Sequence, residues 1–110
     1  MNNLGKAFEE QACEYLKEKG YEILEQNYTC RYGEIDIVAR QGKYTVFVEV
    51  KYRKNDDFCT PAEAITVQKL KKLEKAALDY IACHGESFYR FDAVCITGNE
   101  ITHIENISYF

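Results

Sequence analysis

The sequence predicts a single-domain α/β protein in which helices pack against a mixed β-sheet. Two alternating apolar stretches flank Gln41 and Gly42 and predict a β-hairpin within residues 35–53. Helical periodicity comes before this hairpin and returns after it, and a further strand follows the second helix. A helix between two strands of one sheet predicts parallel pairing of those strands through a crossover. The predicted order is helix, three strands, helix, two strands.

The first helix is predicted over residues 4–19, and Gly20 ends it as a C-terminal cap residue would. Its apolar positions are Phe8, Ala12, Tyr15 and Leu16. Glu9 shares a stripe of small and apolar side chains with Gly5, Ala12 and Leu16, and an inward carboxylate needs a partner. Residues 21–29 then predict the first strand.

The second helix has two candidate starts. Thr60 is followed by proline and by Glu63, which fits a cap, whereas Thr66 is an alternative cap that would separate a first turn from the main helix. The buried stripe is predicted to be Leu70, Leu73, Ala77 and Tyr80, and Gly85 ends the helix. Residues 88–97 predict the fourth strand and residues 101–107 the fifth.

The hairpin places acidic and apolar side chains on opposite faces. A two-residue loop at Gln41 and Gly42 sets Ile37 opposite Val46, and side chains then alternate with period two. One face is predicted to be the core face, and the other carries the charged residues. The core face holds Ile35, Ile37, Val46, Val48 and Val50; the second face holds Glu34, Asp36, Phe47, Glu49 and Lys51.

Asp36 and Glu49 are predicted to be diagonal neighbours, roughly 7–8 Å apart at the backbone and within joint reach of one cation. Lys51 lies beside Glu49 on the same side. Carboxylates that hold Mg²⁺ next to an ammonium group suit metal-assisted phosphodiester hydrolysis, in which the lysine stabilises developing negative charge. The same alternation also fits a half-exposed hairpin with a solvated charged face, so both interpretations remain open at this point.

Asp36 followed after twelve residues by Glu49, Val50 and Lys51 resembles the D…ExK core of the PD-(D/E)xK nucleases, which include restriction endonucleases and archaeal Holliday-junction resolvases. The phrases GEIDIV, FVEVK and PAEAIT, in this order, resemble the YraN family of small bacterial proteins over nearly the whole chain. One position departs from that family, which usually has glycine where Phe8 stands.

The resemblance implies a restriction-endonuclease-like fold and a metal-dependent endonuclease that acts on branched or structured DNA. It implies Mg²⁺ as cofactor, with Mn²⁺ as a substitute, and a homodimer, because symmetrical cleavage of a junction needs two sites. Lys51 would stabilise the transition state. The implied metal ligands are Glu9, Asp36, Glu49 and the Val50 carbonyl. The alternative is a nucleic-acid-binding or adaptor domain that keeps the fold without catalysis.

Composition favours one folded domain over residues 1–110, because 46% of the residues are hydrophobic and 14% aromatic. No stretch approaches the length of a transmembrane span, and the acidic N-terminal segment does not resemble a signal peptide, so we expect a cytoplasmic protein without a membrane partner. The five cysteines are odd in number and lack CxxC spacing, which argues against a zinc site and predicts reduced thiols.

A net charge of −4 argues against a general polyanion binder. Residues 51–75, however, hold seven of the fourteen basic residues and only four of the eighteen acidic ones. This local excess predicts a basic ridge for DNA, although each lysine taken alone also fits a solvated helix face. His84 and His103 lack ligand spacing and are interpreted as structural or surface residues. The residues predicted to contact DNA are Arg53, Lys54, Lys69, Lys72 and Lys75.

Overall fold

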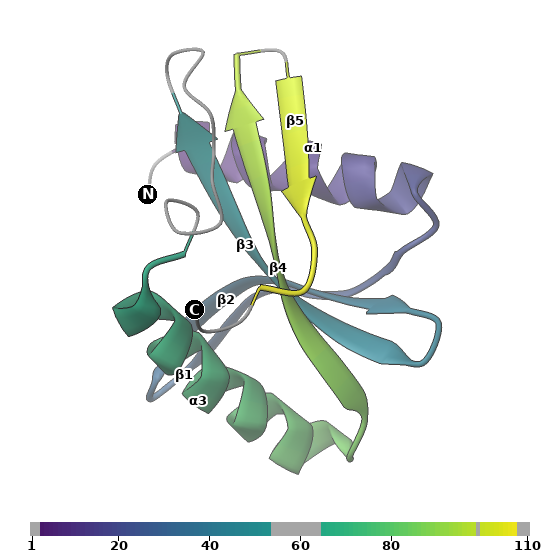
Figure 1. Cartoon of the computed structure of the whole chain (residues 1–110), viewed down its shortest axis with the longest axis vertical. Helices are drawn as coiled ribbons and strands as arrows, with labels where there is room; N and C mark the ends of the chain where they lie inside the picture. Colours follow the sequence, from purple (N-terminus) through teal and green to yellow (C-terminus); the bar gives the residue numbers. More distant parts are fainter. Residues whose placement is uncertain (1–2, 54–64, 99, 108–110) are drawn as a thin grey trace.

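The computed structural model describes residues 3–53, 65–98 and 100–107, which form a five-stranded sheet with two helices (Figure 1). The sheet order is β1-β2-β3-β4-β5; β3 and β4 are parallel, and the other neighbours are antiparallel. The predicted element order and the mixed sheet are therefore confirmed. The elements are α1 (Asn3–Glu18), β1 (Glu22–Cys30), β2 (Gly33–Gln41), β3 (Tyr44–Arg53), α3 (Val67–His84), β4 (Phe88–Thr97) and β5 (Glu100–Ile104).

The two helices cover opposite faces of the sheet (Figure 1), so the core has two layers. On the α1 side, Leu16 packs with Val46, Val48 and other strand residues. On the α3 side, the predicted stripe is buried against the sheet together with Phe47 and Phe91, which confirms it. Neither helix is long and apolar enough to cross a membrane. The α3 stripe comprises Leu70, Leu73, Ala76, Ala77 and Tyr80.

The ends of α3 follow the predicted capping residues. The Thr66 side chain accepts a hydrogen bond from the Lys69 backbone N–H at 3.1 Å, so Thr66 is the N-cap. The alternative start at Thr60 lies outside the described residues. At the other end, the Gly85 N–H donates to the Ile81 carbonyl at 2.8 Å, and Gly85 has a φ of 101°, which favours glycine.

In the β2–β3 hairpin the turn lies one residue later in the sequence than predicted, which changes the register. Gln41 pairs with Tyr44, so Gly42 and Lys43 form the loop, and Ile37 faces Val48. Gly42 has a φ of 58°, and the first central position of a tight hairpin turn requires such a value, which explains the shift. The shift moves each pair by two residues and leaves the alternation of faces unchanged.

Strand β2 changes face near its middle. Ile37 packs in the α1 layer, whereas Ile35 packs with Phe47 in the α3 layer, so the prediction that Ile35 and Ile37 share one core face is wrong. Opposite this point in β1, Asn27 has a φ of 55°, a conformation that bends the strand and that asparagine tolerates better than most residues. The solvated-face interpretation is also wrong for Glu49, which is only 5% exposed beneath α3.

The cysteines do not all behave as predicted. Cys13, Cys30 and Cys83 are free, as expected for reduced thiols. Cys95, buried in β4, is disulfide-bonded, so the expectation that all five are reduced is wrong at this position.

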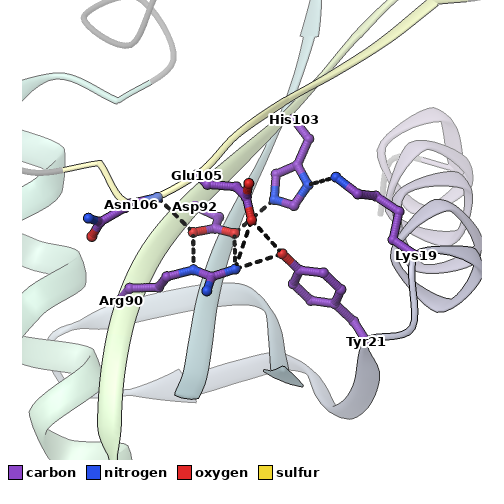
Figure 2. Close-up of polar contacts among 7 residues, drawn as sticks. All are labelled: Lys19, Tyr21, Arg90, Asp92, His103, Glu105 and Asn106. Carbon is purple, nitrogen blue, oxygen red and sulfur yellow. Dashed lines mark hydrogen bonds and ion pairs between the residues drawn. The ribbon is translucent and has the colours of Figure 1, made fainter. Parts of the chain in front are cut away.

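A buried ion-pair network centred on Asp92 joins β4 to the chain that follows β5 (Figure 2). Asp92 is fully buried and accepts hydrogen bonds from Arg90 Nε at 3.0 Å, His103 Nε2 at 2.7 Å and the Asn106 N–H at 3.0 Å. Arg90 also donates to Glu105 at 3.1 Å. We call these five residues the Asp92 network, and it satisfies the buried carboxylate on every side.

The Asp92 network also orients its histidine, and its carboxylates are already paired where a cation could otherwise bind. Lys19 Nζ, just beyond α1, lies 3.0 Å from His103 Nδ1. Since an ionised carboxylate can only accept, the His103 Nε2–H donates to Asp92, and Nδ1 faces Lys19. Asp92, His103 and Glu105 lie close enough together to ligate a cation, but the Arg90 guanidinium already pairs with both carboxylates. The network is therefore structural, and so is His103.

Removing the central carboxylate should strongly destabilise the fold. Asp92→Ala would leave Arg90 buried without its main partner, and we expect a loss of about 3–5 kcal/mol in the free energy of unfolding, measured by urea denaturation at pH 7. Glu105→Gln is the control, because that side chain is 51% exposed and should cost less than about 1 kcal/mol. Equal effects of the two changes would contradict the central role of Asp92.

The stability difference between wild type and Asp92→Ala should also depend on pH. Burial favours a higher pKa for Asp92, but the hydrogen bonds from His103, Arg90 and Asn106 together hold that pKa below its ordinary value. A depressed carboxyl pKa contributes stability above the unfolded-state value, about 4, and this contribution is lost as the pH falls. The difference between wild type and Asp92→Ala should therefore narrow below about pH 4.

Candidate functional site

Strands β2 and β3 separate at Asp36, and this separation creates a fork between them. Their ladder ends at the pair Ile37–Val48; beyond it β2 stays paired only with β1, and β3 only with β4. Asp36 is the first residue past the last pair. Its Oδ2 accepts a hydrogen bond from the Val50 N–H at 2.9 Å, so a side chain replaces the missing backbone acceptor.

Three carboxylates meet at the fork. Oxygens of Glu9 from α1 and of Glu34 and Asp36 from β2 all lie within 4.8 Å of one another. Glu9 and Asp36 are half-buried, and Glu34 is exposed. The predicted inward stripe of α1 thus brings Glu9 to Asp36, while Glu34, which received no role in the sequence prediction, joins them.

Phe8 holds this end of α1 against the sheet. Its ring stacks on that of Tyr52 in β3, with centroids 4.0 Å apart and planes 15° from parallel. The YraN resemblance places glycine at this position, so the larger residue needs a place to pack. Tyr52 provides it, and the helix still reaches the fork through the next residue, Glu9.

Asn27 was missed by the sequence prediction. It sits in β1 opposite the fork with its φ of 55°, and its side chain interacts with Glu9 and lowers the pKa of that carboxyl. One residue therefore both bends the hairpin and orients a carboxylate. The available sign was an asparagine inside an otherwise strand-like stretch, since asparagine is depleted in strands.

Glu49 pairs with a lysine of α3. Its Oε1 lies 2.8 Å from Lys69 Nζ, and the Glu49 side chain is 7% exposed against 49% for Lys69. The alternation of β3 had placed Lys51 beside Glu49. Lys51 is half-buried but is not among the residues that line the hollow at Glu49, whereas Lys69 is.

Burial and mutual repulsion raise the pKa values of two carboxylates at the fork. Burial, and next the charge of Glu49, raise the pKa of Asp36 to about 6 from 3.8, although the Val50 N–H opposes this shift. Burial and Asp36 likewise raise the pKa of Glu9, against the hydrogen bond from Asn27. Burial would lower the pKa of Lys69, but its contact with Glu49 more than offsets this and raises it.

This donor set suits a hard divalent cation. Carboxylate oxygens are the ligands that Mg²⁺ and Mn²⁺ prefer, and a cation would relieve the repulsion that raises the pKa of Asp36. Glu9, Glu34 and Asp36 lie close enough together to hold it, and Glu49, whose charge acts on Asp36, lies beside them. The Val50 carbonyl stays a prediction as a further ligand.

An open hollow of about 540 Å³ lies between the fork and α3. One wall is acidic, and the other carries lysines and small polar side chains. Of the residues predicted to contact DNA, Lys69 and Lys72 line this hollow, Lys75 lies one turn further along α3, and Arg53 ends β3; Lys54 lies outside the described residues. The lining residues are Tyr32, Gly33, Glu34, Asp36, Glu49, Thr66, Gln68, Lys69, Lys72 and Leu73.

Fold and site define a small α/β protein with a carboxylate cluster at a strand fork beneath a basic helix. Residues 8–96 match the model of the "Uncharacterised protein family UPF0102", and the chain belongs to this family, which confirms the YraN resemblance. Similar relatives are UPF0102 proteins of Sulfurihydrogenibium sp. (46% identity, covering 93% of this chain and 90% of that protein), Thermodesulfovibrio yellowstonii (44%; 94% and 93%) and Lachnoclostridium phytofermentans (47%; 93% and 89%).

The raised pKa of Asp36 makes a prediction about stability. Between about pH 4 and 6 the folded protein binds more protons at Asp36 than the unfolded chain does, so this group makes the free energy of unfolding fall as the pH rises. Asp36→Asn keeps an acceptor for the Val50 N–H and removes the charge. In EDTA at pH 7.5 the free energy of unfolding of this variant should exceed that of wild type by about 1–3 kcal/mol. At pH 4 this difference should be smaller.

Urea denaturation of both proteins at the two pH values measures this difference. Glu86→Gln, at an exposed carboxylate outside the fork, is the control and should change nothing by more than about 0.5 kcal/mol. If Asp36→Asn were less stable than wild type at pH 7.5, the interpretation that the charged Asp36 carboxylate destabilises the fold would be contradicted.

Proposed function

We propose that this protein is a metal-dependent endonuclease that hydrolyses phosphodiester bonds in branched or structured DNA. The observation that carries the proposal is the convergence of Glu9, Glu34 and Asp36 within 4.8 Å, next to the Glu49–Lys69 pair. Supporting it is the D…ExK pattern, whose Asp36 and Glu49 both lie at the fork. Family membership fits the proposal but does not assign an activity.

Glu9, Asp36 and Glu49 would hold Mg²⁺ or Mn²⁺, with Glu34 as an additional carboxylate and the Val50 carbonyl as a further ligand. When bound, the ion lowers the pKa of a water molecule and polarises the phosphate. The chain's own residues fix the geometry: the Val50 N–H holds Asp36 at 2.9 Å, and Asn27 holds Glu9. Such anchoring is what a preorganised site requires.

The lysines would act on the phosphate. Lys69, already 2.8 Å from Glu49, is placed to stabilise negative charge that develops on a phosphate bound at the fork. Lys72 lines the same hollow and would position the DNA backbone. Lys51 keeps the role that the D…ExK pattern gives it as a prediction.

A local basic surface can attract DNA although the net charge is −4. Lys69, Lys72 and Lys75 follow one another at three-residue intervals along α3, beside the acidic fork. A homodimer would supply the two sites that symmetrical cleavage of a junction needs, and it is part of the proposal.

The second candidate is a nucleic-acid-binding domain without catalysis, and one observation favours it. The Lys69 ammonium already neutralises Glu49, so part of the acidic cluster is satisfied without a metal ion. In that case the fork would be a structural ion pair, and only the lysines of α3 would meet the nucleic acid. The two experiments below separate the candidates.

Metal binding is tested by titrating Mn²⁺ into the protein by calorimetry. Wild type should bind, and Asp36→Asn should bind at least about tenfold more weakly, because it removes one charged ligand from the centre of the cluster. Glu105→Gln, in the Asp92 network, is the matched control and should bind as wild type does. Equal binding by Asp36→Asn, or no binding by wild type at millimolar Mn²⁺, would remove the metal from this proposal.

Cleavage is tested on labelled junction, flap and duplex DNA with Mg²⁺ or Mn²⁺. Glu49→Ala should abolish cleavage. Lys69→Ala should slow it about 10²-fold or more, since loss of one transition-state donor costs roughly 3–4 kcal/mol. Lys71→Ala, exposed on α3 outside the hollow, is the control.

Lys51→Ala completes this set. If it also slows cleavage about 10²-fold, both lysines act at the fork. If it cleaves as fast as wild type, the role belongs to Lys69 alone. No cleavage by wild type on any of the three substrates with either metal would instead favour the binding domain.

A further inference from the structure

A second hollow lies beside α3 and adjoins the fork. It measures about 480 Å³ and is mostly apolar, and Tyr32 lines both this hollow and the one at the fork. The Tyr32 side chain therefore stands at the boundary between the carboxylate site and a groove along the helix. The groove residues are Tyr32, Lys75, Leu78, Asp79 and Ala82.

The helix face above these hollows is both basic and apolar. Lys69, Lys72 and Lys75 lie three residues apart, so they span about 9 Å along the helix axis. Leu78, one turn beyond Lys75, is 55% exposed, which is unusual for a large apolar side chain. The one carboxylate of the groove, Asp79, accepts a hydrogen bond from the Tyr28 hydroxyl and is thereby engaged with the protein.

The Tyr32 side chain is held in place by the neighbouring Arg31. The Arg31 guanidinium lies over its ring, 4.8 Å from the centroid, and donates to the Tyr32 hydroxyl at 2.6 Å. Arg31 itself is exposed, so its remaining donors face solvent. The part of the Tyr32 ring that lines the hollows is where a base would stack, and the lysines of α3 offer its phosphates counter-charge.

This combination discriminates between kinds of nucleic acid. A duplex presents phosphates to such a surface but keeps the faces of its bases stacked inside the helix. An unpaired strand exposes both, and only its bases can use Tyr32 and Leu78. The row of Lys69, Lys72 and Lys75 along α3 offers counter-charge to phosphates, which favours a nucleic acid over an apolar peptide.

We propose that a single-stranded arm of nucleic acid lies along α3, with phosphates at Lys69, Lys72 and Lys75 and one unpaired base against Tyr32 and Leu78. The inference rests on the proposed function, because the arm leads directly to the fork. It narrows the substrate class to nucleic acid in which unpaired nucleotides border the cleaved bond, as in a flap or an open junction.

Fluorescence anisotropy in EDTA and low salt tests the groove without cleavage. The probes are labelled single-stranded oligonucleotides, one of deoxyribose and one of ribose, and a DNA duplex of the same length. Tyr32→Ala should weaken single-strand binding about tenfold and change duplex binding less than about twofold, because stacking serves only the unpaired base. The ratio of the two single-strand affinities identifies which sugar the groove takes.

Three further variants control this result. Tyr32→Phe keeps the ring and should bind as wild type does. Leu78→Glu changes an exposed side chain, so it should fold normally and yet weaken single-strand binding about as much as Tyr32→Ala. Phe88→Ala removes another exposed aromatic, 63% accessible, at the start of β4 and outside both hollows, and should have no effect.

The inference is overturned if Tyr32→Ala and Leu78→Glu both bind single strands as wild type does, or if they lose single-strand and duplex binding equally. That outcome is separate from the nuclease proposal. Wild type that cleaves while the Tyr32 variants bind normally would keep the nuclease and remove the groove. Wild type that binds through Tyr32 but never cleaves would keep the groove and favour the binding domain.

Discussion

The arrangement of the site depends on a single hydrogen bond, from the Val50 N–H to the Asp36 carboxylate. Where β2 and β3 separate, this backbone donor would otherwise be buried without an acceptor, at a cost of about 1–3 kcal/mol. Asp36 supplies the acceptor and is thereby fixed at the fork beside Glu49, where burial and the charge of Glu49 raise its pKa to about 6 against the effect of the hydrogen bond. One side chain thus satisfies the backbone of β3 and also supplies a carboxylate to the cluster for which metal binding is proposed.

The order of elements could be predicted because hydrophobic periodicity and capping residues such as Thr66 and Gly85 are local properties of the chain. The fork could not. Alternation assumes that a strand keeps one twist, whereas β2 changes face opposite Asn27, whose positive φ is a consequence of packing and is not encoded in the parity of the strand. The error in the face of Ile35 has this origin, whereas the error in the turn arose because Gly42 takes the first central turn position with its positive φ.

The same limit applies to the candidate site. Asp36 and Glu49 could be predicted by counting residues within one hairpin, and Glu9 could be predicted from its place on a helical stripe. Glu34 and the ion pair of Lys69 with Glu49 were not, because they depend on how α1 and α3 approach the sheet. A lysine twenty residues downstream of Glu49 takes the contact that strand alternation gave to Lys51, since helices are placed by tertiary packing.

The parallel pairing of β3 with β4 has a consequence for folding. The hairpins β1–β2 and β2–β3 join residues close in sequence, but Tyr44 pairs with Phe88, and closing so long a loop costs entropy before any contact is gained. Until β4 arrives, β3 is an edge strand whose backbone groups on that side lack their ladder partners. The sheet that carries Asp36 and Glu49 is therefore completed by a long-range step, which is expected to follow the local hairpins on the folding pathway.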